Sequence, residues 1–531
     1  MSIEVSNIDH LGLVAGIIDE VGIVEKINEL IPTHKTEKIN TGQAVKGMIL
    51  NGLGLVSSPL YLFSRFFQGK ATEHLLGKGI KPEYLNDDRL GRVLDELYQT
   101  GLNQVFISIV LSAVKKYLIE VGTVHLDSSS FQVTGQDQTE SSQFQEEEPQ
   151  VVKITYGYSK DNRPDLKQFM MNLICSHDGD VPLWVEIGNG NDSDTKEFSR
   201  LMREYKSQLK WDSLIVVDSA FYSQENLQLS QSISWLSRVP VTIKLAKKLI
   251  EEITAEELQP SHFKGYRYKE LEKTYGGIPQ RWLVVESEKR RESDFKKIAK
   301  NLVKEAQEAE QKVRQLSRQT FACIPDAKKA SQKLLKKSKY HQLTNIEVEV
   351  IPSKKTSDLT QKTEYQVRGT VSLCEEKLKP IRSAAGRFII ATNLLDEEVL
   401  SAEEMLSKYK GQQGVERGFR FLKDPMFLTD SVFLKSPQRI ESLGLIMGLC
   451  LLVYTLGQRQ LRQCLQRRQA TVSNQLGRPT NRPTLRWIFQ CFQSIHLLVV
   501  SPTVEVSNLT EERLFLLKFF PPACQRYYLL S

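Results

Sequence analysis

Three acidic residues, far apart in the sequence, stand where their carboxylates could share a metal ion. Asp127 closes the β-rich run TVHLD, and Asp218 closes the fully apolar run SLIVVD. A carboxylate at the end of a buried strand is held at the rim of a sheet, where its oxygens suit a hard divalent cation. One such aspartate alone is more often a strand terminator or a helix N-cap. The third residue is Glu416, which lies among glycines, aromatic residues and cations.

The segment around Glu416 is expected to form one helix, from about Ala402 to Lys423. Ser401, with Glu404 three residues later, gives a capping-box pattern, and Pro425 limits the far end. The alternative is a solvated amphipathic helix in which the glutamate is incidental.

One edge of this helix would present polar side chains to the sheet. Seven residues make nearly two helical turns, so Tyr409, Glu416 and Lys423 line up, with Gln412 beside them. The adjoining stripe is apolar and would face the core. Glycines occupy a third strip, where each costs about 1 kcal/mol relative to alanine unless close packing compensates. They are Gly411, Gly414 and Gly418.

Together, Asp127, Asp218 and Glu416 could share a pair of Mg²⁺ ions. Two metal ions activate a water or hydroxyl on one side of a phosphodiester and stabilise the leaving oxygen on the other. Cationic side chains nearby would hold the phosphates without reading sequence. The candidate DNA contacts are Tyr409, Gln412, Arg417, Arg420 and Lys423 in the glutamate segment, with Arg163 and Lys167 near a predicted hairpin tip. For the last two, a solvated turn is the alternative.

Two further features have a structural and a functional interpretation. His125 would point to the same side of its strand as Asp127, either as a metal ligand or as a packed, hydrogen-bonded histidine. The lysine-rich run KKASQKLLKKSK, at 328–339, either contacts a phosphate backbone or is an unoccupied positive surface.

The elements that must position these residues follow from changes in periodicity along the chain. Helical patterns dominate at first, strand patterns begin near residue 121, and a charged helical stretch with further strands interrupts the α/β pattern later. This order predicts an α/β fold with helices on a mixed sheet. The predicted parts are an all-α N-terminal module with possible DNA binding (1–120), a catalytic core (121–240), an α+β insertion (241–385), a second part of the core with the glutamate helix (386–456) and a basic helical C-terminal region (457–531).

The composition and the charge distribution indicate a soluble protein that binds a polyanion. The 531 residues are 40% hydrophobic and 25% charged, with a net charge of +7. Between Ser442 and Val504 there are seven arginines and no Asp or Glu, which favours a polyanionic partner over a bare positive surface. Seven cysteines without a CxxC pair fit a reducing cytoplasm. The most apolar run, Leu443–Leu456, is shorter than a membrane span and is expected to be a buried helix.

In combination, these blocks resemble the DDE transposases of bacterial insertion sequences, particularly the branch with a Tyr, Arg, Glu, Lys signature. Tyr409, Glu416 and Lys423 match the signature, while Gln412 stands at the arginine position and lacks its charge. VHLDSSSF looks like the first-Asp block of the family, GYSKDNRPDLKQF like its following hairpin, and IVVDSAFYS like its second-Asp block.

The resemblance implies an RNase H-like catalytic fold with a large insertion before the glutamate helix. It also implies catalysis by Asp127, Asp218 and Glu416 with two Mg²⁺ ions, for which Mn²⁺ could substitute. The implied partners are the terminal inverted repeats of the element and target DNA, bound by a homodimer on the nucleoid in the cytoplasm, with no membrane. The alternatives are a metal-dependent nuclease of the same fold that cuts without joining, and an inactive DNA-binding derivative.

Overall fold

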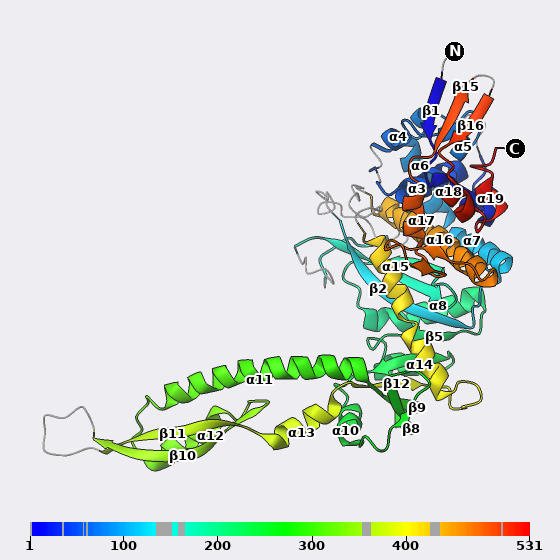
Figure 1. The fold of residues 1–531 in the computed structure, drawn as a ribbon. Coiled ribbons are helices and arrows are strands. Elements are labelled where there is room, and N and C mark those ends of the chain that lie inside the picture. Colours follow the sequence, from blue (N-terminus) through cyan, green and yellow to red (C-terminus); the bar gives the residue numbers. More distant parts are fainter. Residues whose placement is uncertain are drawn as a thin grey trace. The chain divides into compact units, whose positions relative to one another are not determined.

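The chain folds into two compact units (Figure 1). The first unit comprises Met1–Ser237 and Ser407–Ser531, and the second comprises Arg238–Leu406. The predicted insertion at 241–385 lies within the second unit, which continues past the predicted end. The structure is a computed structural model that describes residues 3–530 except for 34–36, 57, 60–61, 134–150, 158–164, 353–362, 425–435 and 501–502.

The first unit contains a mixed run of strands in the order β4-β3-β2-β5-β6. β2 pairs antiparallel with β3 and parallel with β5, so the strand direction changes at β2. Every residue of β3 is buried, which is typical of a strand covered on both faces. The strands are β2 (Thr123–Gln132), β3 (Gln168–Ser176), β4 (Pro182–Gly188), β5 (Leu214–Val217) and β6 (Trp235–Val239).

β2 is longer than predicted, because its second half pairs with a neighbour that local sequence does not reveal. The strand was expected to end at Asp127, but it continues to Gln132, and the serines after Asp127 pair with β3. Parallel pairing with β5 nevertheless stops at Leu126 and Val217. Asp127 therefore marks the end of the parallel pairing rather than the end of the strand.

Helices pack against this sheet. α15 packs on β2 and β3, and α16 packs on β4 and on the N-terminal helices. The run VVKITYGYS has the composition of a strand, but its described residues contribute only a bridge between Thr155 and Gln168. The helices around the sheet are α8 (Asp194–Leu209), α9 (Gln224–Leu229), α14 (Ala402–Lys410), α15 (Gln413–Leu422) and α16 (Pro437–Arg467).

The prediction that α16 is a buried core helix is confirmed. By length and composition it could cross a membrane, but 89% of its most apolar window is buried inside the protein. α6 (Asp87–Thr100) and α7 (Leu102–Tyr117) are long and apolar enough to cross a membrane only when they are taken together, and the chain bends by 85° between them.

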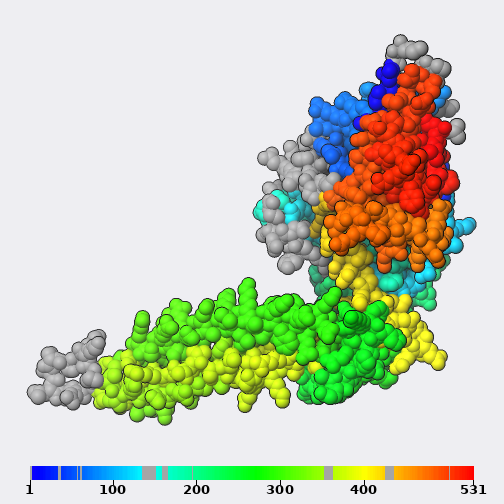
Figure 2. Space-filling view, viewed as in Figure 1, coloured from blue at the N-terminus to red at the C-terminus, as the bar shows by residue number. Residues whose placement is uncertain are grey.

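The N-terminal module is mostly helical, but the prediction that it is all-α was wrong. β1 (Ile3–Asn7) pairs antiparallel with β15 (His496–Val500), which pairs with β16 (Thr503–Ser507). Both ends of the chain thus contribute to one small sheet, as the neighbouring blue and red segments in Figures 1 and 2 show. This pairing joins residues almost 500 positions apart, so the local helical pattern could not indicate it.

The remaining elements of the first unit are short or belong to the N-terminal module. The module also contains α1 (Leu11–Val21), α2 (Ile23–Leu30), α3 (Thr41–Gly52), α4 (Phe63–Phe66), α5 (Thr72–Leu76) and the 3₁₀ helix Pro82–Tyr84. The C-terminal region contains β13 (Val472–Ser473), β14 (Pro479–Thr480), α17 (Leu485–Cys491), α18 (Glu511–Leu517) and α19 (Pro522–Gln525).

The second unit combines an antiparallel sheet with a long helical arm. β12 pairs antiparallel with β9, so residues predicted to belong to the catalytic core (386–406) group with the insertion instead. α11 runs beside α12 and the β10–β11 hairpin (Figure 1). The elements are α10 (Lys244–Glu252), β7 (Gln259–Pro260), β8 (Tyr266–Tyr275), β9 (Ile278–Ser287), α11 (Glu288–Leu316), α12 (Ile324–Leu334), β10 (His341–Pro352), β11 (Thr363–Leu373), α13 (Glu375–Ala384) and β12 (Arg387–Thr392).

A buried histidine ties the N-terminal module to the C-terminal region. His10 is 1% exposed, and its ring lies 4.6 Å from that of Phe489. The side-chain amide of Gln493 donates to its Nδ1 at 2.8 Å, so its Nε2 carries the hydrogen and donates to the carbonyl of Leu53 at 2.8 Å. Burial lowers the pKa of His10 to about 4, and the folded protein therefore keeps this ring neutral.

Acidification is expected to destabilise the protein through His10. The unfolded chain protonates this histidine near its ordinary pKa of about 6.5, whereas the folded chain resists protonation until about pH 4. The unfolded state therefore binds more protons in this window, and stability falls as pH drops. Between pH 7 and 4.5 the free energy of unfolding should decrease by about 2 kcal/mol through this residue. Urea denaturation at both pH values measures the change. His10→Gln should lose that part of the pH dependence, and an unchanged pH dependence in this variant would contradict the assignment.

Candidate active site

The sheet brings the two predicted aspartates side by side. Leu126 of β2 is paired with Val217 of β5, so Asp127 and Asp218 are the next residues on two adjacent parallel strands. Both aspartates therefore come directly after the last pair of the parallel ladder, at neighbouring positions where this pairing ends. Both aspartates are partly exposed, whereas the residues before them are buried.

Backbone amides orient both carboxylates. The amide of Ser128 donates to Oδ1 of Asp127 at 2.8 Å, and the amide of Ala220 donates to Oδ1 of Asp218 at 2.7 Å. The hydroxyl of Ser237, on β6, donates to the carbonyl of Asp218 at 2.9 Å and fixes the chain where β5 ends. The result is a rigid pair of hard oxygen donors at one position of the sheet.

The glutamate segment forms two helices, so the prediction of one helix over 402–423 was wrong. α14 ends at Lys410 and α15 begins at Gln413. Tyr409 lies on α14, half-buried, and so does not share a continuous helical edge with Glu416.

Close packing of two glycines accounts for the break. A Cβ on Gly411 would lie 2.5 Å from Nδ1 of His177, and one on Gly414 would lie 2.0 Å from Oδ1 of Asp180. Both partners belong to the turn between β3 and β4. The predicted compensation by close packing is therefore confirmed at these positions, and the chain bends where it meets this turn.

Gln412 attaches the start of α15 to β2. Its side-chain amide donates to the carbonyl of Leu126 at 2.9 Å, and its Oε1 accepts from Nδ1 of His125 at 3.0 Å. His125 then accepts at Nε2 from Nδ1 of His177, at 2.9 Å. Burial lowers the pKa of His125 to about 4, which keeps the ring neutral. At 8% exposure, Gln412 holds the helix against the strand instead of facing a DNA phosphate as predicted.

Glu416 lies on α15 between two points at which this helix contacts β2. Gln412 is bound next to Asp127, and further along the rings of Phe419 and Phe131 lie 6.5 Å apart. Around the helix, Glu416 is about 40° from Gln412 and about 60° from Phe419, so it lies at the border of the buried face of α15. Its side chain is exposed.

The three predicted carboxylates, all of them among the described residues, do not form a metal site together in this structure. Within the described ranges, no three His, Cys, Asp or Glu side chains lie close enough to hold a metal ion together. Asp127 and Asp218 are adjacent and supply the hard oxygen donors that a divalent cation requires. The donor chemistry of these two aspartates fits such an ion.

The other predicted DNA contacts are dispersed. Arg417 is exposed and pairs with Asp180 at 2.9 Å, and Arg420 is exposed. The amino group of Lys423 lies 5.4 Å from the centre of the Phe131 ring. Lys167 is half-buried before β3, and Arg163 lies outside the described residues.

Three of the seven arginines in the acid-free window have structural roles. Arg459 is 7% exposed and pairs with Asp178, and Arg486 pairs with Asp424. Arg462 donates to the carbonyl of Pro483 at 2.9 Å. The arginines that remain exposed are Arg467, Arg468, Arg478 and Arg482.

Sequence reasoning missed the turn between β3 and β4 as part of the site. His177 contacts His125, Asp178 binds Arg459, and Asp180 binds Arg417. The local signal is the composition HDGD, which is typical of a turn but does not indicate the partners of that turn. This turn links β2, α15 and α16.

Removing the Gln412 attachment should impair both stability and the position of α15. Gln412→Leu leaves the buried carbonyl of Leu126 and the His125 ring without these partners, which should cost about 1–3 kcal/mol of unfolding free energy. A displacement of about 1 Å at a reacting group can lower a rate about 100-fold, so cleavage should slow by about 10- to 100-fold. The matched control, Gln413→Leu, changes the exposed neighbour and should leave both quantities near wild type. Equal effects of the two substitutions in urea denaturation and cleavage assays would contradict this role.

The geometry agrees with a comparison of the sequence with protein families. A family model described as a transposase DDE domain matches residues 122–456, which is more than half of the chain. The chain belongs to the DDE transposase family. The transposase is accordingly an enzyme of the DDE type, and the matched range includes both aspartates and Glu416.

Other comparisons describe the rest of the transposase. A model for a domain of unknown function (DUF4277) matches residues 3–111. No curated protein matches the sequence. Among solved structures, the transposase is similar to a cryo-EM structure of the piggyBac transposase synaptic complex with hairpin DNA. The identity is 10% and the TM-score 0.37, over 91% of this chain and 79% of that one.

Proposed function

We propose that this transposase cuts the ends of a bacterial insertion sequence and joins them to target DNA. The observation that carries the proposal is the adjacency of Asp127 and Asp218, both oriented by backbone amides where the parallel pairing of β2 and β5 ends. The antiparallel β3-β2 pair beside the parallel β2-β5 pair supports an RNase H-like core. Gln412 stands at the arginine position of the Tyr, Arg, Glu, Lys signature and, in this proposal, orients the helix that carries Glu416.

The carboxylates of Asp127, Asp218 and Glu416 hold Mg²⁺ in this proposal, with Mn²⁺ as a substitute. When bound, a pair of such ions supplies an activated water or hydroxyl and stabilises the leaving oxygen. The two backbone amides keep the aspartates oriented, and α15 carries Glu416 toward them. Arg417, Arg420 and Lys423 orient the DNA by its phosphates, without reading its sequence.

The reaction consists of two displacements at phosphorus. In the first, the oxygen of water forms a new bond to the phosphorus of an element end, and the bond to the 3′ oxygen breaks to give a free 3′-hydroxyl. In the second, that hydroxyl attacks a phosphodiester of target DNA, so a new DNA bond forms and one target bond breaks. The partners are the terminal inverted repeats and target DNA, brought together by a homodimer acting on the nucleoid in the cytoplasm.

The test is an assay of purified full-length protein with end-labelled DNA that carries the two ends of its own element. With Mg²⁺ and unlabelled target DNA, we expect nicked ends and slower-migrating joined products. Cleavage without joined products would support the nuclease alternative and overturn transposition. Binding without cleavage in either Mg²⁺ or Mn²⁺ would support the inactive DNA-binding alternative.

A further inference from the structure

The positive charge of this protein is concentrated in one segment of the second unit. Residues 288–340, which include α11 and α12, contain 16 Lys and Arg against 7 Asp and Glu, a net charge of +9. The whole chain carries only +7, so all of the other residues together are slightly acidic. The lysine-rich run at 328–339 is part of this segment. A charge gathered in this way produces a local attraction for polyanions that the net charge of the chain conceals.

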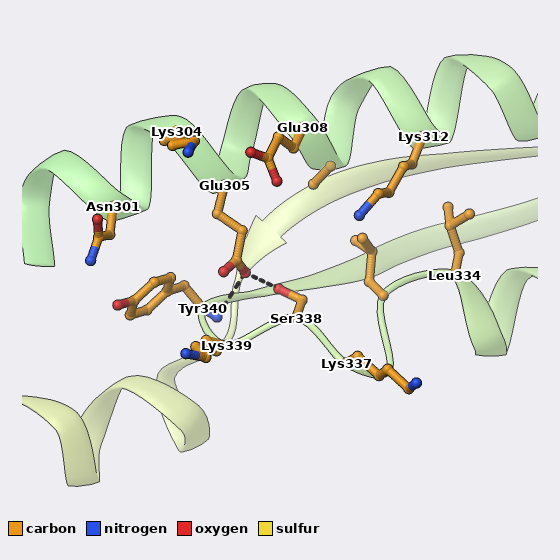
Figure 3. Close-up of a pocket in the computed structure, with 12 residues that line it drawn as sticks. Asn301, Lys304, Glu305, Glu308, Lys312, Leu334, Lys337, Ser338, Lys339 and Tyr340 are labelled. Atoms are coloured by element: carbon orange, nitrogen blue, oxygen red, sulfur yellow. Dashed lines mark hydrogen bonds between the residues drawn. The ribbon is translucent and has the colours of Figure 1, made fainter. Parts of the chain in front are cut away.

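Lysines line both sides of a cleft between α11 and the loop after α12. Its volume is about 380 Å³. Lys304 and Lys312 line it from α11, and Lys337 and Lys339 line it from the loop (Figure 3). Leu334, between the two sides, belongs to the small apolar core that joins α12 to the β10–β11 hairpin. The two basic sides are therefore held by packed elements.

One acid of the cleft, the half-buried Glu305, is bound by the loop after α12. The hydroxyl of Ser338 and the amide of Tyr340 both donate to Oε1 of Glu305 (Figure 3). Burial alone would raise the pKa of Glu305, but these hydrogen bonds and His341 lower it, so the carboxylate stays ionised. Glu305 thus holds the loop closed. Together with Glu308, which is exposed between Lys304 and Lys312, it offsets two of the four lysine charges and leaves the cleft with a net positive charge.

These lysines lack the ion pairs that other lysines of the same unit make. Lys247, Lys248 and Lys269 each pair with a glutamate. None of the eleven lysines at 296–339 is within 4 Å of a carboxylate oxygen, as far as the described residues extend. All eleven are exposed. Their charge is available to an outside partner.

The spacing along α11 suits the backbone of a DNA duplex. Lys297, Asn301, Lys304 and Lys312 fall along one edge of the helix at about 100° per residue. At 1.5 Å per residue this edge is about 22 Å long. A strand of B-DNA carries one phosphate per about 3.4 Å of axis, so the edge covers roughly six phosphates.

We propose that this lysine cleft, with the α11 edge that borders it, binds the phosphate backbone of double-stranded DNA without regard to sequence. The proposal rests on the proposed function, because it is the transposition reaction that brings DNA to the protein. Lysine is a compact point charge on a flexible stem, which suits phosphates rather than base edges. The second unit then holds DNA while the carboxylates of the first unit perform the chemistry.

The test compares two triple variants of the full-length protein that remove the same charge. Lys304→Gln, Lys337→Gln and Lys339→Gln change the cleft, whereas Lys244→Gln, Lys247→Gln and Lys248→Gln change exposed lysines on α10 in the same unit. The probe is a mixed-sequence duplex of roughly 30 base pairs without element sequence, long enough for the α11 edge. The Kd is measured at several NaCl concentrations.

The cleft variant should bind this duplex at least tenfold more weakly. The slope of its logarithmic affinity against logarithmic salt concentration should be smaller in magnitude by about 2 to 3, because each phosphate contact contributes about 0.9 to this slope. The α10 variant should behave like wild type. Equal Kd values and slopes for the two variants, or wild-type binding that is independent of salt, would overturn the proposal.

The same preparations distinguish this proposal from the proposed function. If the wild-type protein does not cleave DNA in Mg²⁺ but the two variants still differ in salt-dependence slope, the proposed function is wrong and the cleft proposal stands. If the cleft variant has the salt-dependence slope of the wild type and the wild-type protein cleaves DNA, the cleft proposal is wrong and the proposed function stands. Thermal unfolding of both variants should match wild type because the lysines are exposed, so a binding defect cannot be assigned to unfolding.

Discussion

Replacing Asp127 or Asp218 with asparagine is expected to slow DNA cleavage by about 10³-fold or more, because each replacement removes a charged metal ligand from a site that acts as a unit. A factor of 10³ corresponds to about 4 kcal/mol of transition-state stabilisation. Asparagine keeps the shape of the side chain and one oxygen, so the sheet should be preserved. DNA affinity should remain within a few fold of wild type because the phosphate contacts lie elsewhere. Single-turnover cleavage and direct binding are the two measurements.

The matched control is Asp212→Asn. Asp212 lies just before β5, and its side chain is 93% exposed, so the same chemical change should leave cleavage near the wild-type rate. Wild-type cleavage by Asp218→Asn would remove that residue from the active site, whatever its place in the sheet.

Glu416→Gln is the sharpest member of this series, because Glu416 lies on a separate helix and is exposed. The variant should bind DNA and fail to cut it. If it cuts normally, the site uses the two aspartates without this glutamate. Restoration of cleavage in any of the three variants by Mn²⁺ would support a ligand role, since a change of metal does not compensate for a folding defect.

Replacing Arg459 with methionine is expected to lower the free energy of unfolding by about 3 kcal/mol, because breaking a buried ion pair leaves its partner charge unpaired. Arg459 donates to Oδ1 of Asp178 at 3.0 Å and to the carbonyls of Tyr117 and Leu118. Methionine keeps the aliphatic packing and removes these bonds, together with the one that Arg459 donates to Oδ2 of Asp178. Urea denaturation at pH 7 measures the loss.

Two further variants show whether the ion pair is the cause. Arg467→Met, on the exposed end of the same helix, should change stability by less than about 0.5 kcal/mol. Combining Arg459→Met with Asp178→Asn removes the stranded charge and should recover part of the lost stability. Equal stability of Arg459→Met and Arg467→Met would contradict the structural role of Arg459. Cleavage should also decrease in Arg459→Met, because the turn that holds Asp178 also contacts α15 through Asp180.

Local sequence patterns were sufficient for features that depend on local physics. The apolar run ending in Asp218 predicted a buried strand, and the structure has β5 there. The apolar run before Leu456 predicted a core helix, which is α16. These predictions hold because the spacing of apolar residues along a strand or a helix depends on which residues of that same element are buried.

Features that depend on distant partners could not be predicted in this way. The helix break at Gly411 arises where the chain meets His177, and the burial of Arg459 arises from Asp178, 281 residues earlier. Sequence composition counted that arginine as part of a basic surface. The pairing of β1 with β15 similarly joins the two ends of the chain. In each case the local sequence contained the residue but not its partner.

The most direct test of this account is a crystal structure of the transposase bound to DNA from its element end and soaked with Mn²⁺. The account predicts anomalous scattering from a cation coordinated by Asp127, Asp218 and Glu416 together. A cation held elsewhere, or one held by the two aspartates while Glu416 stays turned toward solvent, would contradict the claim that these three carboxylates form a single active site.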